Sequence, residues 1–314
     1  MPDFSVTKIL DEYLLAKIDD NFRDNSHFHP SEFHGCKRLM VYKYYLQKGI
    51  ISANGAKEKI DPCTQRIFDN GHHVHYRWGE YLGDRRCTGN LLKGVWKCKN
   101  SYAHELEWKV NKEKKKEECL PKIYGQEKKL GIIKPDTPCE ECGCPDYDHM
   151  EIGFLDEETL IGGHIDCLLL LPTGEHLILD YKSIRKRLFD KLYDGPKPEH
   201  FVQMQCYLYV SGLKYGKFIY ECKDDQDVKE FDVNRDEQFI QHIVEEAKSL
   251  KTIVSYKNSN DKWTLPPRAN STNPKKDEAE GLPVVYYNKD MTACMRCMFR
   301  KHCWGSNKSE NKSV

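Results

Sequence analysis

The sequence predicts an α/β fold in which helices flank a central β-sheet. The clearest strand signals, MEIGFLDEE, TLIGGHIDCLLLL and HLILDYKSI, follow one another within residues 150–184 and are separated by turn residues. Apolar residues at helical spacing precede and follow this block, in residues 5–20, 31–48, 62–83, 198–212 and 235–250. We therefore expect residues 150–184 to form a three-stranded meander at the centre of the sheet, joined by strands over 216–222 and 228–232.

The helical segments carry start and stop signals. Ser31 follows Pro30 and can cap the helix over 31–48, which would put Cys36 early in that helix. Gly212 should end the helix over 198–212, because glycine readily adopts the left-handed conformation that closes many helices. In the helix over 62–83, four large side chains are spaced to lie near one face: Ile67, Val74, Trp78 and Tyr81.

Changes in composition divide the chain into five parts. Residues 1–86 are helical, and residues 149–250 contain the strand signals and should form the core that bears the functional site. Between them, residues 87–148 are rich in Lys and Glu and show little periodicity, so we expect an inserted module. Residues 251–304 form a C-terminal loop and cysteine segment, and residues 305–314 have the composition of a disordered tail.

The charge composition excludes a global positive field around the protein. Lys and Arg together number 49, as do Asp and Glu, so contact with nucleic acid would need local basic segments such as Arg185-Lys186-Arg187. No apolar run reaches about 18 residues, the length that spans a bilayer. The N-terminal segment lacks the basic flank and continuous apolar stretch of an export signal, so we expect a cytoplasmic protein with no membrane partner.

The 14 cysteines indicate metal binding, because a reducing compartment keeps thiols free and their clustering then favours metal sites over disulfides. Cys294-x2-Cys297-x5-Cys303 supplies three thiolates. A tetrahedral zinc ion or a cubane iron–sulfur cluster requires four ligands, so the fourth must come from elsewhere in the chain. The spacing alone leaves both metals open.

A second cysteine set lies in the expected insertion. Cys139-x2-Cys142-x-Cys144, with Gly143 for a tight turn and Cys98 upstream, is typical of a degenerate zinc ribbon. A regular ribbon would have another cysteine shortly after Cys98, where Lys99-Asn100-Ser101 stands instead. Cys87, Cys119 and Cys144 compete for the fourth position, and unliganded cysteines are the alternative. The remaining cysteines fall in helix or strand patterns and are predicted as small core residues: Cys63, Cys167, Cys206 and Cys222.

Two carboxylates and a lysine are expected to meet on neighbouring strands. Asp166 lies in a strand that enters a hairpin, and Asp180 and Lys182 lie in the returning strand, two residues apart and so on one face. Such a group can hold a hard divalent cation and activate water for phosphodiester hydrolysis. Acid-x-Lys triplets also occur by chance, as at Glu113-Lys114-Lys115, but those lie in solvated charge runs, whereas Asp180 follows a buried apolar strand.

The order of these residues resembles that of the RecB-like PD-(D/E)XK nucleases, a superfamily that includes AddB and the CRISPR-associated exonucleases. Gly71-x-x-Val74-His75 resembles the Gly-x-x-x-His element, with His72 and His73 as rivals for the ligand position. Glu151 follows, then Gly163-His164-Ile165-Asp166 and Asp180-Tyr181-Lys182. Gln205-x-x-x-Tyr209 resembles the Gln-x-x-x-Tyr helix, and Gln203 is its rival.

The resemblance implies a restriction-endonuclease-like core built on a mixed sheet, with Mg²⁺ or Mn²⁺ bound by His75, Asp166 and Asp180. It gives catalytic roles to a larger set: Lys182, Asp180, Asp166, Glu151, Gln205 and Tyr209. It also implies that Cys36, in Cys36-Lys37-Arg38, completes a [4Fe–4S] site with Cys294, Cys297 and Cys303, tying the two ends of the chain together.

The implied activity is that of a DNA nuclease, expected to act as an exonuclease on single strands or DNA ends in recombination, repair or CRISPR-type processing. The chain has no Gly-x4-Gly-Lys-Ser/Thr phosphate-binding loop, so a helicase, a recombinase or a CRISPR integrase is an expected partner. The alternative is a non-catalytic nucleic-acid-binding scaffold with zinc and iron–sulfur modules. The carboxylates and lysine favour the nuclease.

Overall fold

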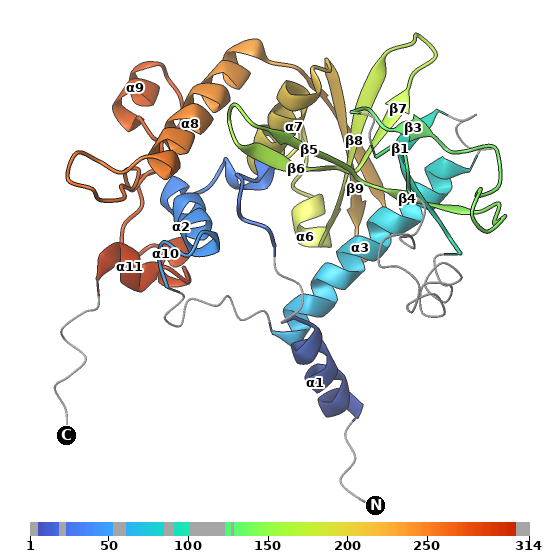
Figure 1. Cartoon of the computed structure of the whole chain (residues 1–314), viewed down its shortest axis with the longest axis horizontal. Helices are drawn as coiled ribbons and strands as arrows, with labels where there is room; N and C mark the ends of the chain where they lie inside the picture. The colour runs from blue at the N-terminus through green and yellow to red at the C-terminus, as the bar shows by residue number, and fades with distance from the viewer. Residues whose placement is uncertain are drawn as a thin grey trace, which may run out of the picture.

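A mixed β-sheet surrounded by helices forms the centre of the protein (Figure 1). The computed structural model describes residues 6–18, 23–52, 61–84, 91–100, 123–126 and 129–305. The strand order is β10-β9-β8-β7-β1-β2, and both β3 and β4 also pair with β1. The predicted α/β class, with a central mixed sheet flanked by helices, is confirmed.

One parallel strand pair gives the sheet its mixed character. Its strands are β1 Leu92–Cys98, β2 Ile123–Tyr124, β3 Ile132–Ile133, β4 Tyr147–Met150, β7 Cys167–Leu170, β8 His176–Ile184, β9 Tyr215–Cys222 and β10 Val228–Asn234. β8 and β9 run parallel, whereas β7–β8, β9–β10 and the pairs of β1 are antiparallel. Parallel neighbours need a crossover, and helix α7, Pro198–Ser211, lies in the connection between β8 and β9.

The expected meander over 150–184 is divided into two hairpins. β5 Ile152–Asp156 and β6 Ile161–Ile165 form a separate two-stranded sheet, and β7 and β8 belong to the main sheet. The break falls at Asp166, between β6 and β7, where the chain changes its pairing partner. A single three-stranded meander was therefore wrong, because the strand pattern continues through the point at which the pairing changes.

The expected insertion over 87–148 contributes to the main sheet. Its first strand, β1, pairs with β7 through Leu92↔Leu169 and Lys93↔Leu168 and with β4 through Cys98↔Tyr147. The described part of this segment is thus continuous with the core, and the domain boundaries remain a prediction.

The long helices agree with the predicted ranges. They are α1 Val6–Ile18, α3 Pro62–Gly83, α7 and α8 Glu237–Ser255. Gly212 has φ 70° and ends α7 as expected. In α3, Val74 is buried, but Ile67 and Tyr81 are 40% and 56% exposed. The remaining helical segments are short: α6 Lys186–Phe189, α9 Pro274–Ala279, α10 Thr292–Met295 and α11 Arg300–Trp304.

The helix predicted over 31–48 begins later than expected. Residues Pro30–Glu32 form a separate 3-10 turn, and helix α2 spans Lys37–Gln47. Cys36 is the residue immediately before α2 rather than one within it. Ser31 does not cap α2; its hydroxyl accepts a hydrogen bond from Arg23 at 3.4 Å. Capping propensity at Pro30-Ser31 therefore identified a turn, not the start of the long helix.

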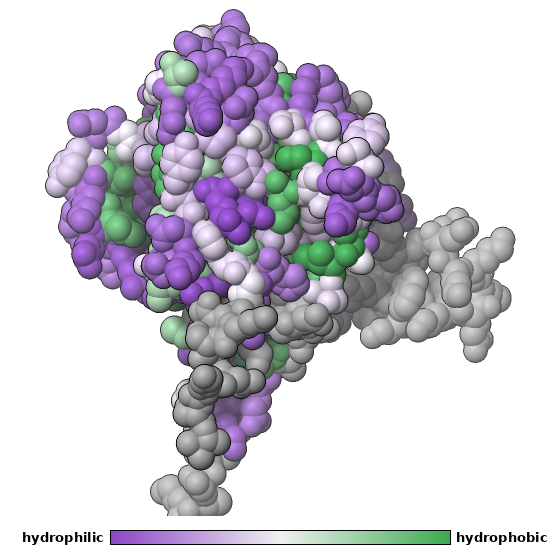
Figure 2. Space-filling view, turned by 90° about the vertical axis from the view of Figure 1, so that its left-hand side faces the viewer, coloured by the Kyte–Doolittle hydropathy of each residue, from purple (hydrophilic) through white to green (hydrophobic). Residues whose placement is uncertain are grey.

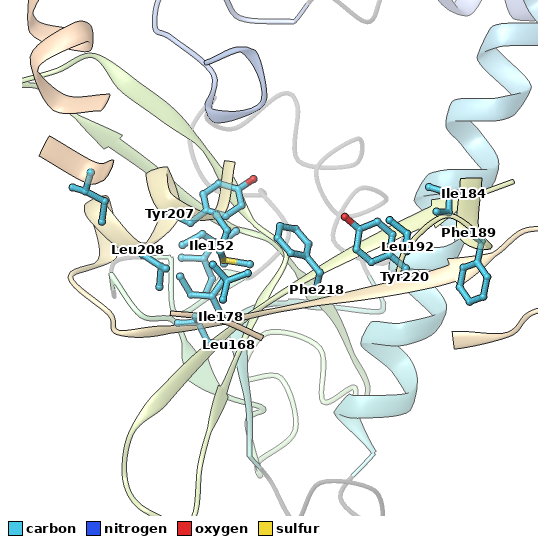
Figure 3. Packing of buried hydrophobic residues seen from close by; sticks show 14 of the residues in the cluster. Ile152, Leu168, Ile178, Ile184, Phe189, Leu192, Tyr207, Leu208, Phe218 and Tyr220 are labelled. Atoms are coloured by element: carbon cyan, nitrogen blue, oxygen red, sulfur yellow. The ribbon is translucent and has the colours of Figure 1, made fainter. Parts of the chain in front are cut away.

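The main core packs α7 against the sheet. Tyr207 and Leu208 of α7 meet Leu168, Ile178 and Phe218 of the sheet (Figure 3). A second cluster joins α2 to α8. Of the cysteines predicted as core residues, Cys167, Cys206 and Cys222 are buried, whereas Cys63 is exposed in the first turn of α3, so that prediction was wrong for Cys63.

The C-terminal helices lie beside α2. Figure 1 shows α10 and α11 next to α2, and Tyr42 stacks on Phe299 with ring centroids 5.1 Å apart. The face of the molecule in Figure 2 is mostly hydrophilic, with separate small apolar areas. Among the described helices, none has the length and apolar character needed to cross a bilayer.

Candidate functional site

Three potential metal ligands converge from separate parts of the fold. His75 comes from α3, Glu151 follows β4, and Asp166 lies between β6 and β7. One ligand atom from each of these residues lies within 4.8 Å of the others. The structure thus brings His75 to two carboxylates that lie more than 70 positions later in the sequence. Imidazole and carboxylate groups are ligands that divalent cations accept.

Helix α3 presents His75 to the carboxylates because it is locked to the sheet. The Trp78 indole donates a hydrogen bond to Glu221 of β9 at 2.8 Å and stacks on Tyr181 of β8. One turn earlier, the His75 ring meets Tyr181 edge-on, and its Nδ1 lies 3.5 Å from Asp166 Oδ2. Of the three candidate histidines, His75 joins the ligand group, His72 lines the adjacent cleft, and His73 is exposed.

Asp180 and Lys182 form an ion pair beside this group. Their positions in β8 put both side chains on one face of the strand, with Lys182 Nζ 2.5 Å from Asp180 Oδ1. Asp180 has no exposed surface, and within the described residues Lys182 is the partner of Oδ1 while Oδ2 has no hydrogen-bond donor. A buried carboxylate with one oxygen left without a partner is compatible with a bound cation.

Burial and mutual repulsion govern the charges of this group. Burial raises the pKa of Asp166, and burial together with the nearby Asp166 carboxylate raises the pKa of Asp180 to about 6. For Lys182, burial lowers the pKa, but Asp180 and Asp166 outweigh that effect and raise it overall. Lys182 therefore stays protonated near neutral pH and offsets part of the negative charge.

Asp166 is oriented by the neighbouring strand. Its Oδ2 accepts a hydrogen bond from the Tyr181 backbone N–H at 2.8 Å. Because the main chain changes partner at Asp166, this residue can turn its side chain toward β8 instead of continuing the ladder of β6. The irregularity in the strand therefore has a chemical consequence: it brings the two carboxylates together.

The structure shows the partners of the two residues in the expected Gln-x-x-x-Tyr element. Gln205 is fully buried, and its amide donates to Asn234 O at 2.9 Å and accepts from Asp236 N at 3.0 Å. Tyr209 donates to Asp156 at 3.1 Å. Gln205 and Tyr209 therefore bond to different parts of the molecule, and Gln205 fixes the connection between β10 and α8.

The same spacing recurs two residues earlier in α7, at Gln203 and Tyr207. Gln203 Nε2 donates to the Tyr207 hydroxyl at 2.7 Å, and both side chains are buried. Burial raises the pKa of Tyr207, and the Asp180 and Asp166 carboxylates raise it further, so this hydroxyl lies near the site. Both pairs have the same four-residue spacing, so the sequence could not show which of them lies near the carboxylates. In the structure, Gln203 and Tyr207 are on the face of α7 that packs on the sheet.

A cleft of about 730 Å³ opens beside the ligand group. Its walls include His75, Glu151 and Asp166, together with His72, His149 and His164. A volume of this size lies in the range of pockets that hold small ligands. The sequence offered no signal for His149, which is partly buried, with its pKa lowered by desolvation to about 4, so it is neutral at physiological pH.

The four cysteines expected at the chain ends surround one small cavity. Cys36, Cys294, Cys297 and Cys303 all line a space of about 30 Å³, which also contacts Arg38, Arg268 and Arg300. Within the described chain, these thiols are not among the groups whose ligand atoms lie within 4.8 Å of one another.

The arginines around this cavity fit an anionic group. Arg38 directly follows Lys37 in α2, and its buried Nε has no hydrogen-bond acceptor among the residues that the structure describes. A cluster with four thiolate ligands carries negative charge, which nearby guanidinium groups would offset. The residues present therefore fit the expected [4Fe–4S] cluster.

The second cysteine set converges in part. Cys98, Cys139 and Cys142 lie with their sulfur atoms within 4.8 Å of one another. Cys144 instead directs its thiol toward Asp146 O at 3.6 Å. Cys87 and Cys119 lie outside the described residues, so their expected roles stay predictions.

No protein-family model matches this chain, and no curated protein matches it. Among solved structures, the "Crystal structure of SSO0001" is similar with a TM-score of 0.41 and 13% identity, covering 96% of this chain and 97% of that one. An alkaline exonuclease (LHK-Exo) from Laribacter hongkongensis has a TM-score of 0.27 and 20% identity, covering 33% of this chain and 57% of that one. LHK-Exo in complex with dAMP has a TM-score of 0.39 and 14% identity, covering 73% and 88%. These likenesses are too distant to establish a shared fold.

We expect divalent-cation affinity to fall as the pH drops through about 6. Carboxylates bind cations in their ionised form, and the pKa of Asp180, raised by burial and by the Asp166 carboxylate to about 6, brings its protonation into this range. Burial also raises the pKa of Asp166. Calorimetric titration with MnCl₂ should show a loss of about tenfold per pH unit below that point. Asp166→Asn should weaken binding at every pH, whereas Asp156→Asn, outside the ligand group, should not. Affinity that is constant down to about pH 5 would contradict the assignment.

Proposed function

We propose that this protein is a metal-dependent DNA nuclease of the RecB-like PD-(D/E)XK type. The observation that carries the proposal is the convergence of His75, Glu151 and Asp166 within 4.8 Å beside the buried Asp180–Lys182 ion pair. Histidine and carboxylate ligands suit Mg²⁺ or Mn²⁺, and an adjacent lysine suits a reaction in which negative charge develops on phosphate. In a purely structural role, Lys182 alone would have to compensate the cost of burying Asp180 next to Asp166.

Each residue has a distinct role in this proposal. His75, Asp166 and Asp180 would hold Mg²⁺ or Mn²⁺, with Glu151 facing the same space; the bound ion supplies Lewis-acid stabilisation and lowers the pKa of water. Lys182, protonated because the carboxylates raise its pKa, orients water and stabilises charge on the phosphate. The Tyr207 hydroxyl, held by Gln203, positions groups on the α7 side of the site.

The proposed substrate is single-stranded DNA or a DNA end. The cleft of about 730 Å³ that His75, Glu151 and Asp166 line is where the strand would reach the carboxylates. Just beyond the end of β8, Arg185 and Arg187 are exposed, whereas Lys186 pairs with Asp225 at 2.9 Å. Exposed arginines next to a catalytic strand suit contacts with the phosphate backbone. A helicase, recombinase or CRISPR integrase that supplies such strands stays a prediction.

The four-cysteine cavity is proposed to hold a [4Fe–4S] cluster with a structural role. Hydrolysis needs no redox step, and the cavity lies between α2 and the C-terminal helices rather than beside the carboxylates. Cys36 and the trio of Cys294, Cys297 and Cys303 would join parts of the chain more than 250 residues apart. The cluster would thus fix the C-terminal segment to α2.

Removal of Lys182 or of the Asp180 charge should stop DNA cleavage. We expect Lys182→Met and Asp180→Asn to lower the rate with Mg²⁺ by about a hundredfold or more, because each removes a group that stabilises the reacting phosphate or its metal. Lys217→Met on the adjacent strand β9 is the matched control, since Lys217 pairs with Glu230 at 2.8 Å and Asp232 at 2.9 Å. Cleavage of labelled single- and double-stranded DNA measures the rate, and fluorescence anisotropy should show that DNA binding persists.

The metal dependence is tested in the same assay. Mg²⁺ or Mn²⁺ should support cleavage, whereas Ca²⁺ should permit DNA binding with little turnover. Full activity in excess EDTA, or wild-type activity of Lys182→Met, would contradict the proposed site. DNA binding by wild-type protein without cleavage under any metal condition would instead favour the scaffold function.

The two Gln-x-x-x-Tyr pairs should differ in their effect on activity. Tyr207→Phe removes a buried hydroxyl near Asp180, and we expect cleavage to slow by about tenfold, the effect of one hydrogen bond. Tyr209→Phe removes a hydroxyl that bonds to Asp156, outside the ligand group, and should leave the rate unchanged. Melting temperatures of both variants separate a catalytic effect from instability. If Tyr209→Phe instead slows cleavage and Tyr207→Phe does not, then the original assignment of Gln205 and Tyr209 is correct.

Loss of Cys36 should remove the iron–sulfur cluster. Anaerobically purified Cys36→Ala should lose its brown colour and its iron, about four atoms per chain in the wild type, and should melt at a lower temperature. Cys63→Ala is the control, because Cys63 is exposed on α3 and distant from the cavity. Iron-free wild-type protein with zinc in its place would show that the cluster assignment is wrong, and the nuclease proposal would remain.

A further inference from the structure

Three thiols at the edge of the main sheet have the spacing of zinc ligands. Cys98 ends β1, and Cys139 and Cys142 come from the loop before β4. Their sulfur atoms lie within 4.8 Å of one another, with Cys98 and Cys142 3.6 Å apart. With a Zn–S bond of about 2.3 Å, a tetrahedron separates its sulfur ligands by about 3.8 Å. The observed distance matches that separation.

The loop backbone is shaped to hold these thiols. Gly143 has φ 69°, and its N–H donates to Cys139 O at 2.7 Å, which closes a tight turn around Cys139 and Cys142. Backbone N–H groups of Glu141 and Cys142 bond to the Cys139 sulfur, and that of Asn100 bonds to the Cys98 sulfur. This turn brings the sulfur atoms of Cys139 and Cys142 close to that of Cys98.

We propose that Cys98, Cys139 and Cys142 bind one Zn²⁺. Soft thiolates select zinc over the hard cations that suit the carboxylate site, so the two sites take different metals. Cys144 is not part of the ligand set, because its thiol bonds to Asp146 O. Water or a further side chain completes the tetrahedron. Cys98 and Cys139 are buried within an aromatic cluster that includes Trp96 and Tyr147, which protects the site from solvent.

This zinc fixes one wall of the carboxylate site, an inference that rests on the proposed function. β4 pairs with β1 from Cys98↔Tyr147 to Val95↔Met150, and Glu151 is the next residue. The metal therefore clamps the start of the strand whose end presents Glu151. Within that strand, His149 packs edge-on against Trp96, which gives the pairing its own apolar contact. Zinc loss should loosen β4 and move Glu151 without altering Asp180 of β8.

Zinc content tests the ligand set directly. Protein purified with a non-thiol reductant should contain about one zinc per chain, and Cys139→Ser/Cys142→Ser should lose it. Cys63→Ser and Cys144→Ser are controls that should retain it. Cobalt substitution should give a thiolate-to-metal charge-transfer band in the wild type that the double variant lacks.

A measurement on the wild-type protein guards against variants that do not fold. Stepwise titration with a mercurial should release zinc to a chromophoric chelator as the clustered thiols react. Wild-type protein without zinc, zinc retained in the double variant, or a Cys98–Cys142 disulfide under reducing conditions would overturn the proposal.

The effect on Glu151 has a separate readout. In the zinc-free double variant, MnCl₂ affinity should fall by about tenfold if one of the ligands loses its position. Unchanged affinity would overturn the clamping role and leave the zinc site standing. Zinc analysis does not depend on DNA cleavage, so failure of the nuclease proposal and failure of the zinc proposal are distinguishable.

Discussion

An ionised carboxylate removed from water costs several kcal/mol unless positive charge or hydrogen-bond donors surround it, and Asp180 stands in that position on β8. It has no exposed surface, and the nearby Asp166 carboxylate adds repulsion. Lys182 offsets part of this cost, but one ammonium cannot neutralise two carboxylates together with Glu151. Above about pH 6 the three carboxylates and Lys182 together therefore carry a net negative charge. A divalent cation resolves that imbalance, which is why we assign metal chemistry here rather than a structural ion pair.

The sheet topology explains how so many polar groups reach one buried place. β8 lies in the interior of the sheet, between β7 and β9. Its side chains alternate between the two faces, so helices packed on either face can contact them. α3 covers one face and brings His75 against Tyr181, while the α7 crossover packs on the other face and brings Tyr207. The break between β6 and β7 turns Asp166 inward. The parallel β8–β9 pair is central, because its crossover is what puts α7 over the site.

Elements with strong local sequence patterns could be predicted from the sequence. The apolar run before Asp180 and the Gly212 stop predicted β8 and α7, and two-residue alternation predicted that Asp180 and Lys182 share a face. Features that depend on pairing between distant strands could not be predicted from the sequence. No local pattern shows that the chain changes partner at Asp166, or that β1 joins the main sheet despite its polar surroundings. Gln203 and Gln205 have the same spacing to a tyrosine, and only the packing of α7 distinguishes them.

Protein packing alone holds Cys36 in place, whereas the C-terminal cysteines Cys294, Cys297 and Cys303 would depend more on a bound metal group. Cys36 is held without any cluster, because the adjacent Lys37 is fully buried in an ion pair with Glu246 at 2.8 Å. Cys294, Cys297 and Cys303 belong to or lie between α10 and α11, which are four and five residues long, far below the length at which a helix is stable alone. This segment is held by Phe299 stacking on Tyr42 and by a hydrogen bond from Arg268 to Cys303 O. An iron–sulfur cluster would therefore join Cys36, which is held rigidly, to the segment of α10 and α11, which has little stability of its own. Its loss should release the C-terminal helices first and leave the packing of the sheet intact.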